Sequence, residues 1–140
     1  MSAARALTLS ELGPGFRAAV DFTVTAEQMR QFAELSGDFN PLHTDEAFAR
    51  RKGFEGRVVY GALLVALVSR LIGMELPGQD GVWASVSLDF RKPLYVGDAA
   101  QVEGIVDEVS EGTGLVRLRL TVRTGSKVLA KGSAEVILER

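Results

Sequence analysis

The sequence predicts an α+β fold in which an antiparallel sheet wraps around one buried helix. Two patterns indicate this fold. Residues 61–72 are apolar almost all the way round a helix, which is typical of a helix that is buried on most sides. The segments after residue 81 alternate between apolar and polar side chains, as antiparallel strands with one buried and one solvated face do. A helix and a sheet of these kinds can bury their apolar surfaces against each other.

The first half of the chain is predicted to hold one strand and two short helices. Residues 16–24 read as the strand. Thr25 and Gln28 then form a capping box at the start of the first helix, and Gly37 ends that helix. A second helix is predicted over residues 45–52, because its acidic residues lie in the first turn and its basic residues in the last, where each charge suits the helix dipole.

The second half of the chain is predicted to be all strand after the apolar helix. Alternation is strictest in residues 82–91 and 116–123, and it is looser in residues 101–109 and 128–138. In chain order, glycine-containing turns separate residues 101–109, 116–123 and 128–138. The predicted sheet is therefore built mainly from the C-terminal half.

Size and composition exclude several classes of protein. A chain of 140 residues fits one domain and nothing divides it, so we expect a single domain over residues 1–140. It has no cysteine and one histidine, which excludes disulfides, thiolate nucleophiles and multi-histidine zinc sites. A net charge of −2 does not favour a nucleic-acid partner. The most apolar run, residues 58–68, is far shorter than the ~20 residues that span a membrane. We therefore expect a cytoplasmic protein.

The residues that can carry chemistry lie between the two short helices, in the segment Ser36-Gly37-Asp38-Phe39-Asn40-Pro41-Leu42-His43. Pro41 restricts Asn40 to extended geometry, so this loop is stiff. It holds a carboxylate, Asp38, and the only imidazole, His43, five positions apart. Such a pair can grip one water and move its protons during hydration of a double bond, each group contributing roughly 10²–10⁴-fold.

A helix that starts at Gly61 would add a third element of that chemistry. Its first amides have no partner within the helix and point toward incoming negative charge, such as the charge that builds on a thioester oxygen during hydration. Glycine lets a ligand approach the backbone closely. One such donor is typically worth ~10²–10³-fold.

Each of these residues also has a purely structural interpretation. The loop is a good turn, in which Asp38 and Asn40 would only cap backbone amides. A lone histidine is more often structural than catalytic. Ser69 could bond back to a carbonyl of its own helix. The basic residues that follow the loop are a solvated helix end under this interpretation: Arg50, Arg51, Lys52 and Arg57.

A family resemblance favours the catalytic interpretation. The segment from Phe32 to His43 resembles the signature of the MaoC-like (R)-specific enoyl-CoA hydratases, which adopt the hot-dog fold. The likeness continues through residues 59–64 and 88–98 and covers most of the chain beyond Phe16. It implies a hot-dog domain that adds water reversibly, in the syn sense, to a trans-2-enoyl-CoA and gives an (R)-3-hydroxyacyl-CoA.

The resemblance also implies roles for single residues. Asp38 and His43 would be the catalytic pair, Asn40 and Ser69 supporting residues, and Gly61 the residue whose backbone N–H faces the thioester. Ser69 lies eight residues beyond Gly61, about 12 Å along a helix, so we expect it to orient the Asp38 side instead of holding the same oxygen. No metal or redox cofactor is implied, because CoA enters as part of the substrate.

Partners are predicted on the same basis. Hot-dog relatives are routinely homodimers, and pairing two sheet edges across a two-fold axis would cover them. We expect no nucleic-acid or membrane partner. The cluster after the loop is predicted to steer or hold the CoA phosphates: Arg50, Arg51, Lys52 and Arg57.

One departure from the family and three alternative functions stay open. Tyr60 stands where related hydratases commonly carry histidine, which predicts a different substrate preference or pocket shape without loss of a catalytic step. The alternatives are a 3-hydroxyacyl-acyl-carrier-protein dehydratase, a hot-dog acyl-CoA thioesterase and a non-catalytic acyl-CoA-binding module. The sequence leaves acyl chain length, carrier and pathway open, with polyester synthesis and β-oxidation among the candidates.

Overall fold

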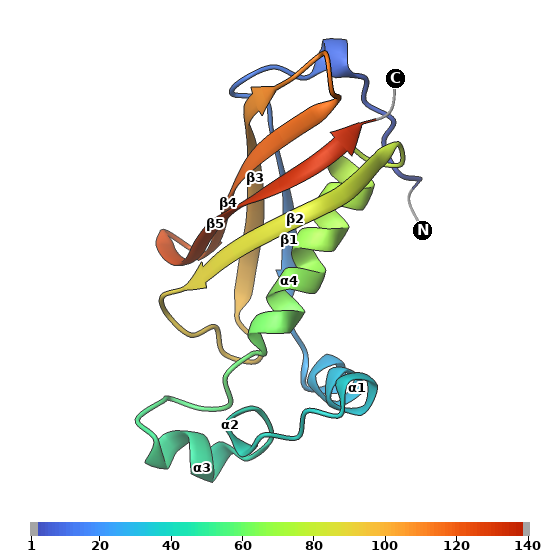
Figure 1. Cartoon of the computed structure of the whole chain (residues 1–140). Helices are drawn as coiled ribbons and strands as arrows, with labels where there is room; N and C mark the ends of the chain where they lie inside the picture. Colours follow the sequence, from blue (N-terminus) through green and yellow to red (C-terminus); the bar gives the residue numbers. More distant parts are fainter. Residues whose placement is uncertain (1–2, 139–140) are drawn as a thin grey trace.

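The computed structural model describes residues 3–138, in which helices and one sheet are arranged as Figure 1 shows. In chain order the elements are η1 (Leu9–Glu11), β1 (Arg17–Thr23), α1 (Ala26–Ser36), α2 (Pro41–Thr44), α3 (Glu46–Arg51), α4 (Gly61–Arg70), η2 (Leu71–Glu75), β2 (Gly81–Phe90), β3 (Ala99–Val109), β4 (Leu115–Thr124) and β5 (Lys127–Leu138).

The five strands form one antiparallel sheet in the order β1-β3-β4-β5-β2. The buried face of this sheet packs against α4 and the π-helical turn η2, which continues α4. Gly104 on β3 allows this close packing, because a Cβ there would lie only 3.1 Å from Leu71 and 3.2 Å from Leu76. The α+β fold predicted from the sequence, a helix against one face of an antiparallel sheet, is confirmed. Within the described residues no helix is long and apolar enough to cross a membrane.

The predicted helix ends are confirmed by their hydrogen bonds. Thr25 Oγ1 accepts from Gln28 N at 3.1 Å, and Gln28 Oε1 accepts from Thr25 N at 3.0 Å, as a capping box requires. Gly37 ends α1 at a φ of 76°, a left-handed conformation that favours glycine. Asp45 caps α3 by accepting from Phe48 N at 3.1 Å.

One element in the loop was not predicted. Residues 41–44 form the helical turn α2, which Asn40 caps by accepting from Leu42 N at 2.9 Å, with Pro41 in the first turn. Asparagine at the cap and proline directly after it are a common start for a helix as well as for a turn. The segment between the two predicted helices is therefore more ordered than a loop.

The burial and the end predicted for the helix from Gly61 were both wrong for the single chain. The helix from Gly61 is buried only on the side of Leu64 and Val68, whereas Ala62, Ala66 and Ser69 are exposed. It also runs on through η2 to Glu75 and does not end at residue 72.

The apolar face predicted for residues 82–90 is largely exposed as well, with Val82, Val86 and Phe90 at 58%, 40% and 53% of full exposure. β2 is an edge strand, and no other element within residues 3–138 covers these side chains.

Candidate active site

The candidate site lies where the helical extension meets the start of α4. Helices α1, α2 and α3 project beyond one end of the sheet, and α4 begins beside them (Figure 1). The peptide N–H of Val58, just before α4, donates to the carbonyl of Leu42 at 3.2 Å. This bond ties the predicted catalytic loop to the segment that leads into the central helix.

Asp38 is held mainly by bonds within its own loop. Its Oδ1 accepts from Asn40 N at 3.0 Å, and its own N–H donates to Ser36 Oγ at 3.1 Å. The capping interpretation is therefore correct for both Asp38 and Asn40, and it leaves the catalytic interpretation open. Asp38 is exposed, and its second carboxylate oxygen accepts no hydrogen bond from residues 3–138.

The imidazole of His43 has a defined tautomer. Its Nδ1 lies 2.7 Å from the carbonyl oxygen of Val58. Since a carbonyl can only accept, Nδ1 must carry the proton and donate it. In a neutral ring the other nitrogen, Nε2, then presents a lone pair that can take a proton or hold a water.

Tyr60 contacts both parts of the predicted catalytic pair. Its ring stacks on the His43 ring with centroids 4.1 Å apart, and its hydroxyl donates to the backbone carbonyl of Asp38 at 2.6 Å. Only 2% of the residue is exposed. Burial raises the pKa of the Tyr60 hydroxyl above its ordinary value, and the Asp38 charge raises it further, so this hydroxyl stays a donor at neutral pH.

His43 and Gly61 line one pocket of about 350 Å³. Its remaining lining is mostly apolar with two basic residues: Phe54, Val58, Val59, Leu64, Phe90, Arg91, Lys92, Pro93 and Leu94. Gly61 begins α4, and within the described residues its N–H and that of Ala62 have no acceptor. The pocket thus brings together two of the three predicted site residues, His43 and Gly61 with its free N–H. Asp38 is not among the lining residues.

The profile of the MaoC-like domain family matches residues 8–128. The chain belongs to this family.

Two relatives and one solved structure illustrate what this MaoC-like chain is similar to. It is 35% identical to an (R)-specific enoyl-CoA hydratase from Aeromonas caviae, over 94% of this chain and 98% of that one. It is 39% identical to a mitochondrial 3-hydroxyacyl-acyl-carrier-protein dehydratase from Arabidopsis thaliana, over 74% of this chain and 58% of the other. The R-hydratase PhaJ1 from Pseudomonas aeruginosa superposes with a TM-score of 0.91 at 31% identity, covering 99% of this chain and 90% of that one. The fold is accordingly the hot-dog fold, as the resemblance implied.

Within residues 3–138, Ser69 makes no hydrogen bond to the loop that holds Asp38 and His43. It is exposed in the last turn of α4, two turns beyond Gly61, and its hydroxyl makes no bond to a carbonyl of its own helix either. Its predicted supporting role stays a prediction.

The basic cluster after the loop also lies outside the His43 pocket. Arg50 pairs with Glu46 at 3.2 Å and donates to the carbonyl of Glu55, while Arg51 and Lys52 lie over the Phe48 ring. Arg57 lines a separate hollow that also contains three acids: Glu46, Glu55 and Asp98. The predicted phosphate contacts of these four residues are untested.

Sequence reasoning missed the two cations that do line the pocket, Arg91 and Lys92. Both are exposed, and neither side chain has an acidic partner among residues 3–138. They follow the edge strand β2 and belong to the segment 88–98 that carries part of the family resemblance, which is the signal that could have identified them.

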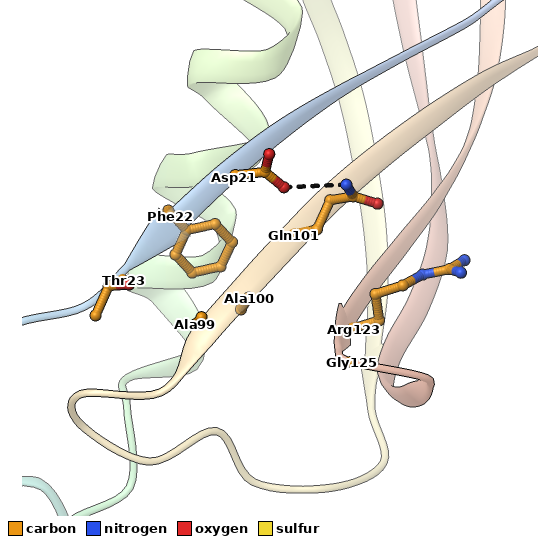
Figure 2. Close-up of a pocket in the computed structure, with 8 residues that line it drawn as sticks. All are labelled: Asp21, Phe22, Thr23, Ala99, Ala100, Gln101, Arg123 and Gly125. Atoms are coloured by element: carbon orange, nitrogen blue, oxygen red, sulfur yellow. Dashed lines mark hydrogen bonds between the residues drawn. The ribbon is translucent and has the colours of Figure 1, made fainter.

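A larger hollow of about 520 Å³ lies elsewhere on the sheet, at β1, β3 and the end of β4 (Figure 2). Asp21 there accepts from Gln101 Nε2 at 3.0 Å, and Arg123 extends away from that pair. Arg123 does not join the Asp21–Gln101 pair and no residue of the segment 36–43 lines this hollow, so its volume alone does not make it the candidate site. Within residues 3–138, no three His, Asp or Glu side chains gather in a way that could hold a metal ion.

Proposed function

We propose that this MaoC-like protein is an (R)-specific enoyl-CoA hydratase that adds water reversibly to a trans-2-enoyl-CoA. The observation that carries the proposal is the pocket lined by both His43 and Gly61. His43 Nδ1 donates to the Val58 carbonyl, so Nε2 keeps its lone pair in the neutral ring, and the Gly61 N–H has no acceptor among residues 3–138. A (R)-specific enoyl-CoA hydratase that matches nearly the whole chain supports it.

In the proposed reaction Asp38 and His43 hold one water between them. The water oxygen bonds to the β-carbon, and the proton that it releases passes through the pair to the α-carbon. Syn addition requires both events to occur on one face of the double bond, so the proposal places the two groups on the same side of the bound substrate. Negative charge builds meanwhile on the thioester oxygen, where the Gly61 N–H stabilises it. Coupled groups titrate together, so the pair is treated as one acid–base unit.

The phosphate-bearing part of the substrate, its handle, is proposed to bind at Arg91 and Lys92. The pocket lining contains no acid, and these unpaired cations lie in the same lining as the imidazole. A phosphate-bearing handle suits that arrangement, because both side chains attract phosphate and neither is neutralised by a neighbour. CoA and the phosphopantetheine of a carrier protein share this chemistry.

We also propose a homodimer that pairs the β2 edges of two copies. Val82, Val86 and Phe90 on this edge expose apolar surface, and unpaired edge strands are readily covered by a second copy. Phe90 also lines the His43 pocket, so a partner seated there would help to close the site. A cytoplasmic location and the lack of a metal or redox cofactor stay predictions, which fractionation of the native cells and metal analysis of active enzyme would test.

The test is the hydration of crotonyl-CoA. We expect loss of the enoyl-thioester absorbance and formation of the R isomer of 3-hydroxybutyryl-CoA. Release of free thiol would indicate the thioesterase, and binding without turnover the non-catalytic module. Turnover of carrier-protein thioesters alone would favour the acyl-carrier-protein dehydratase, for which the Arabidopsis relative is the precedent.

A further inference from the structure

Within residues 3–138, Tyr60 makes the one hydrogen bond that joins Asp38 itself to a residue distant in the sequence. Asp38 has three hydrogen bonds with described residues. Two of them stay within the loop, to Ser36 Oγ and Asn40 N. The third, from the Tyr60 hydroxyl to the Asp38 carbonyl at 2.6 Å, spans 22 residues of sequence. The Val58 bonds to Leu42 and His43 also hold this loop against the body of the protein, and the Tyr60 hydroxyl holds it at Asp38 itself.

The same residue also fixes the imidazole. The Tyr60 and His43 rings stack with an interplanar angle of 29°, and Phe32 packs on Tyr60 with centroids 4.7 Å apart. The Val58 carbonyl holds Nδ1 of His43, and the tyrosine ring holds the plane of the imidazole. Together these contacts set the direction of Nε2.

Tyr60 also directly precedes Gly61 in the chain, at the start of α4. One buried side chain and its chain neighbour thus connect the carboxylate loop, the imidazole and the free helix amide. We propose that Tyr60 is a positioning residue, which sets the placement of Asp38 and His43 relative to the Gly61 N–H without touching the substrate. This inference rests on the proposed function.

The experiment compares Tyr60→Phe with Tyr95→Phe. Tyr60→Phe keeps the stacked ring and removes only the hydroxyl that holds Asp38. Tyr95 is the only other tyrosine, and its hydroxyl accepts from Glu55 N at 3.1 Å, so Tyr95→Phe removes a similar bond away from the catalytic pair. A catalytic group that is misplaced by about 1 Å can lower the rate by ~10²-fold. We therefore expect Tyr60→Phe to lower kcat for crotonyl-CoA by about 10- to 100-fold with KM little changed. Tyr95→Phe should keep both values within about two-fold of the unmodified protein.

A second comparison separates positioning from a general structural role. In an Asp38→Asn background there is no carboxylate to place, so adding Tyr60→Phe should lower the remaining activity by much less than it lowers that of the unmodified protein. If Tyr60→Phe reduces activity by the same factor in both backgrounds, or leaves kcat unchanged, the positioning role is wrong.

The tether can also be measured without turnover. Amide hydrogen exchange at Asn40 and His43 should be faster in Tyr60→Phe and unchanged in Tyr95→Phe, because only the first variant frees the loop. Unchanged exchange in Tyr60→Phe would overturn the inference even in a protein without hydratase activity. An unmodified protein that does not hydrate crotonyl-CoA would contradict the proposed function instead.

Discussion

Substituting alanine for Gly61 separates the stability of the fold from the proposed role of the helix amide. An added Cβ would lie 2.9 Å, 3.1 Å and 3.3 Å from three atoms of the Phe90 ring. These atoms are the far end of a flexible side chain, so the ring can move by the few tenths of an ångström required. Alanine also favours a helix over glycine by up to about 1 kcal/mol. We therefore expect Tm to change by no more than about 3 °C.

Activity should respond very differently to the same change. The methyl group would occupy the side of Gly61 that faces the pocket and keep a thioester oxygen from the backbone N–H. Loss of one oxyanion donor costs ~10²–10³-fold in kcat, or about 3–4 kcal/mol in the barrier. The expected result is a folded, stable protein with a kcat for crotonyl-CoA hydration reduced by at least ~10²-fold.

Gly73→Ala is the matched control. Gly73 lies in η2, which continues the same helix, and an added Cβ there meets no atom within 4 Å. This variant should keep full activity and a Tm at or slightly above that of the unmodified protein. Hydration by Gly61→Ala within about three-fold of the unmodified rate would refute the assignment of its N–H to the oxyanion.

Three further predictions concern the handle, the pH dependence of stability and the assembly. Arg91→Gln with Lys92→Gln should raise KM for crotonyl-CoA about 10-fold at low salt and leave KM for crotonyl-pantetheine, which has no phosphate, unchanged. The pair Arg51→Gln with Lys52→Gln tests the alternative phosphate contacts predicted from the sequence, and a larger rise of KM in this pair than in the first would contradict binding at Arg91 and Lys92. The pKa of the Tyr60 hydroxyl is raised in the folded protein, so the unfolded chain loses this proton first and the free energy of unfolding falls as pH rises above about 10. The Tm of Tyr60→Phe should therefore fall less over this range than the Tm of the unmodified protein. An equal fall of Tm in both proteins would contradict the raised pKa. Val86→Lys places a charge on the exposed β2 edge. Light scattering should report a monomeric mass for this variant and a dimeric mass for the unmodified protein. A monomeric mass for the unmodified protein at micromolar concentration would refute the proposed assembly.

The elements predicted best from the sequence are those set by neighbours in the chain. The Thr25 capping box and the Asp45 cap involve residues three apart, so a single sequence specifies them. Asp38 and His43 could likewise be proposed as a pair from the sequence alone, because both lie within one segment of six residues.

The features that the sequence did not reveal depend on contacts between distant residues. Alternation along β2 shows that one face is apolar but not what covers it, so the exposure of Val82 and Val86 could not be predicted. The pocket joins His43, Gly61 and Arg91 from three separate parts of the chain, and the Tyr60 bond to Asp38 spans 22 residues. Neither arrangement has a local signal.

The central claim, that Asp38 and His43 act together on one water, is tested most directly by kinetics of Asp38→Asn, His43→Gln and the double variant on crotonyl-CoA. Asparagine retains an oxygen that can accept from Asn40 N, so Asp38→Asn removes the charge while keeping the cap. Each single change should lower kcat by roughly 10²-fold or more with KM little changed, and the double change should cost far less than the product of the two. A folded Asp38→Asn protein that hydrates crotonyl-CoA at a near-normal rate would contradict the account, because Asp38 would then serve only to cap its turn.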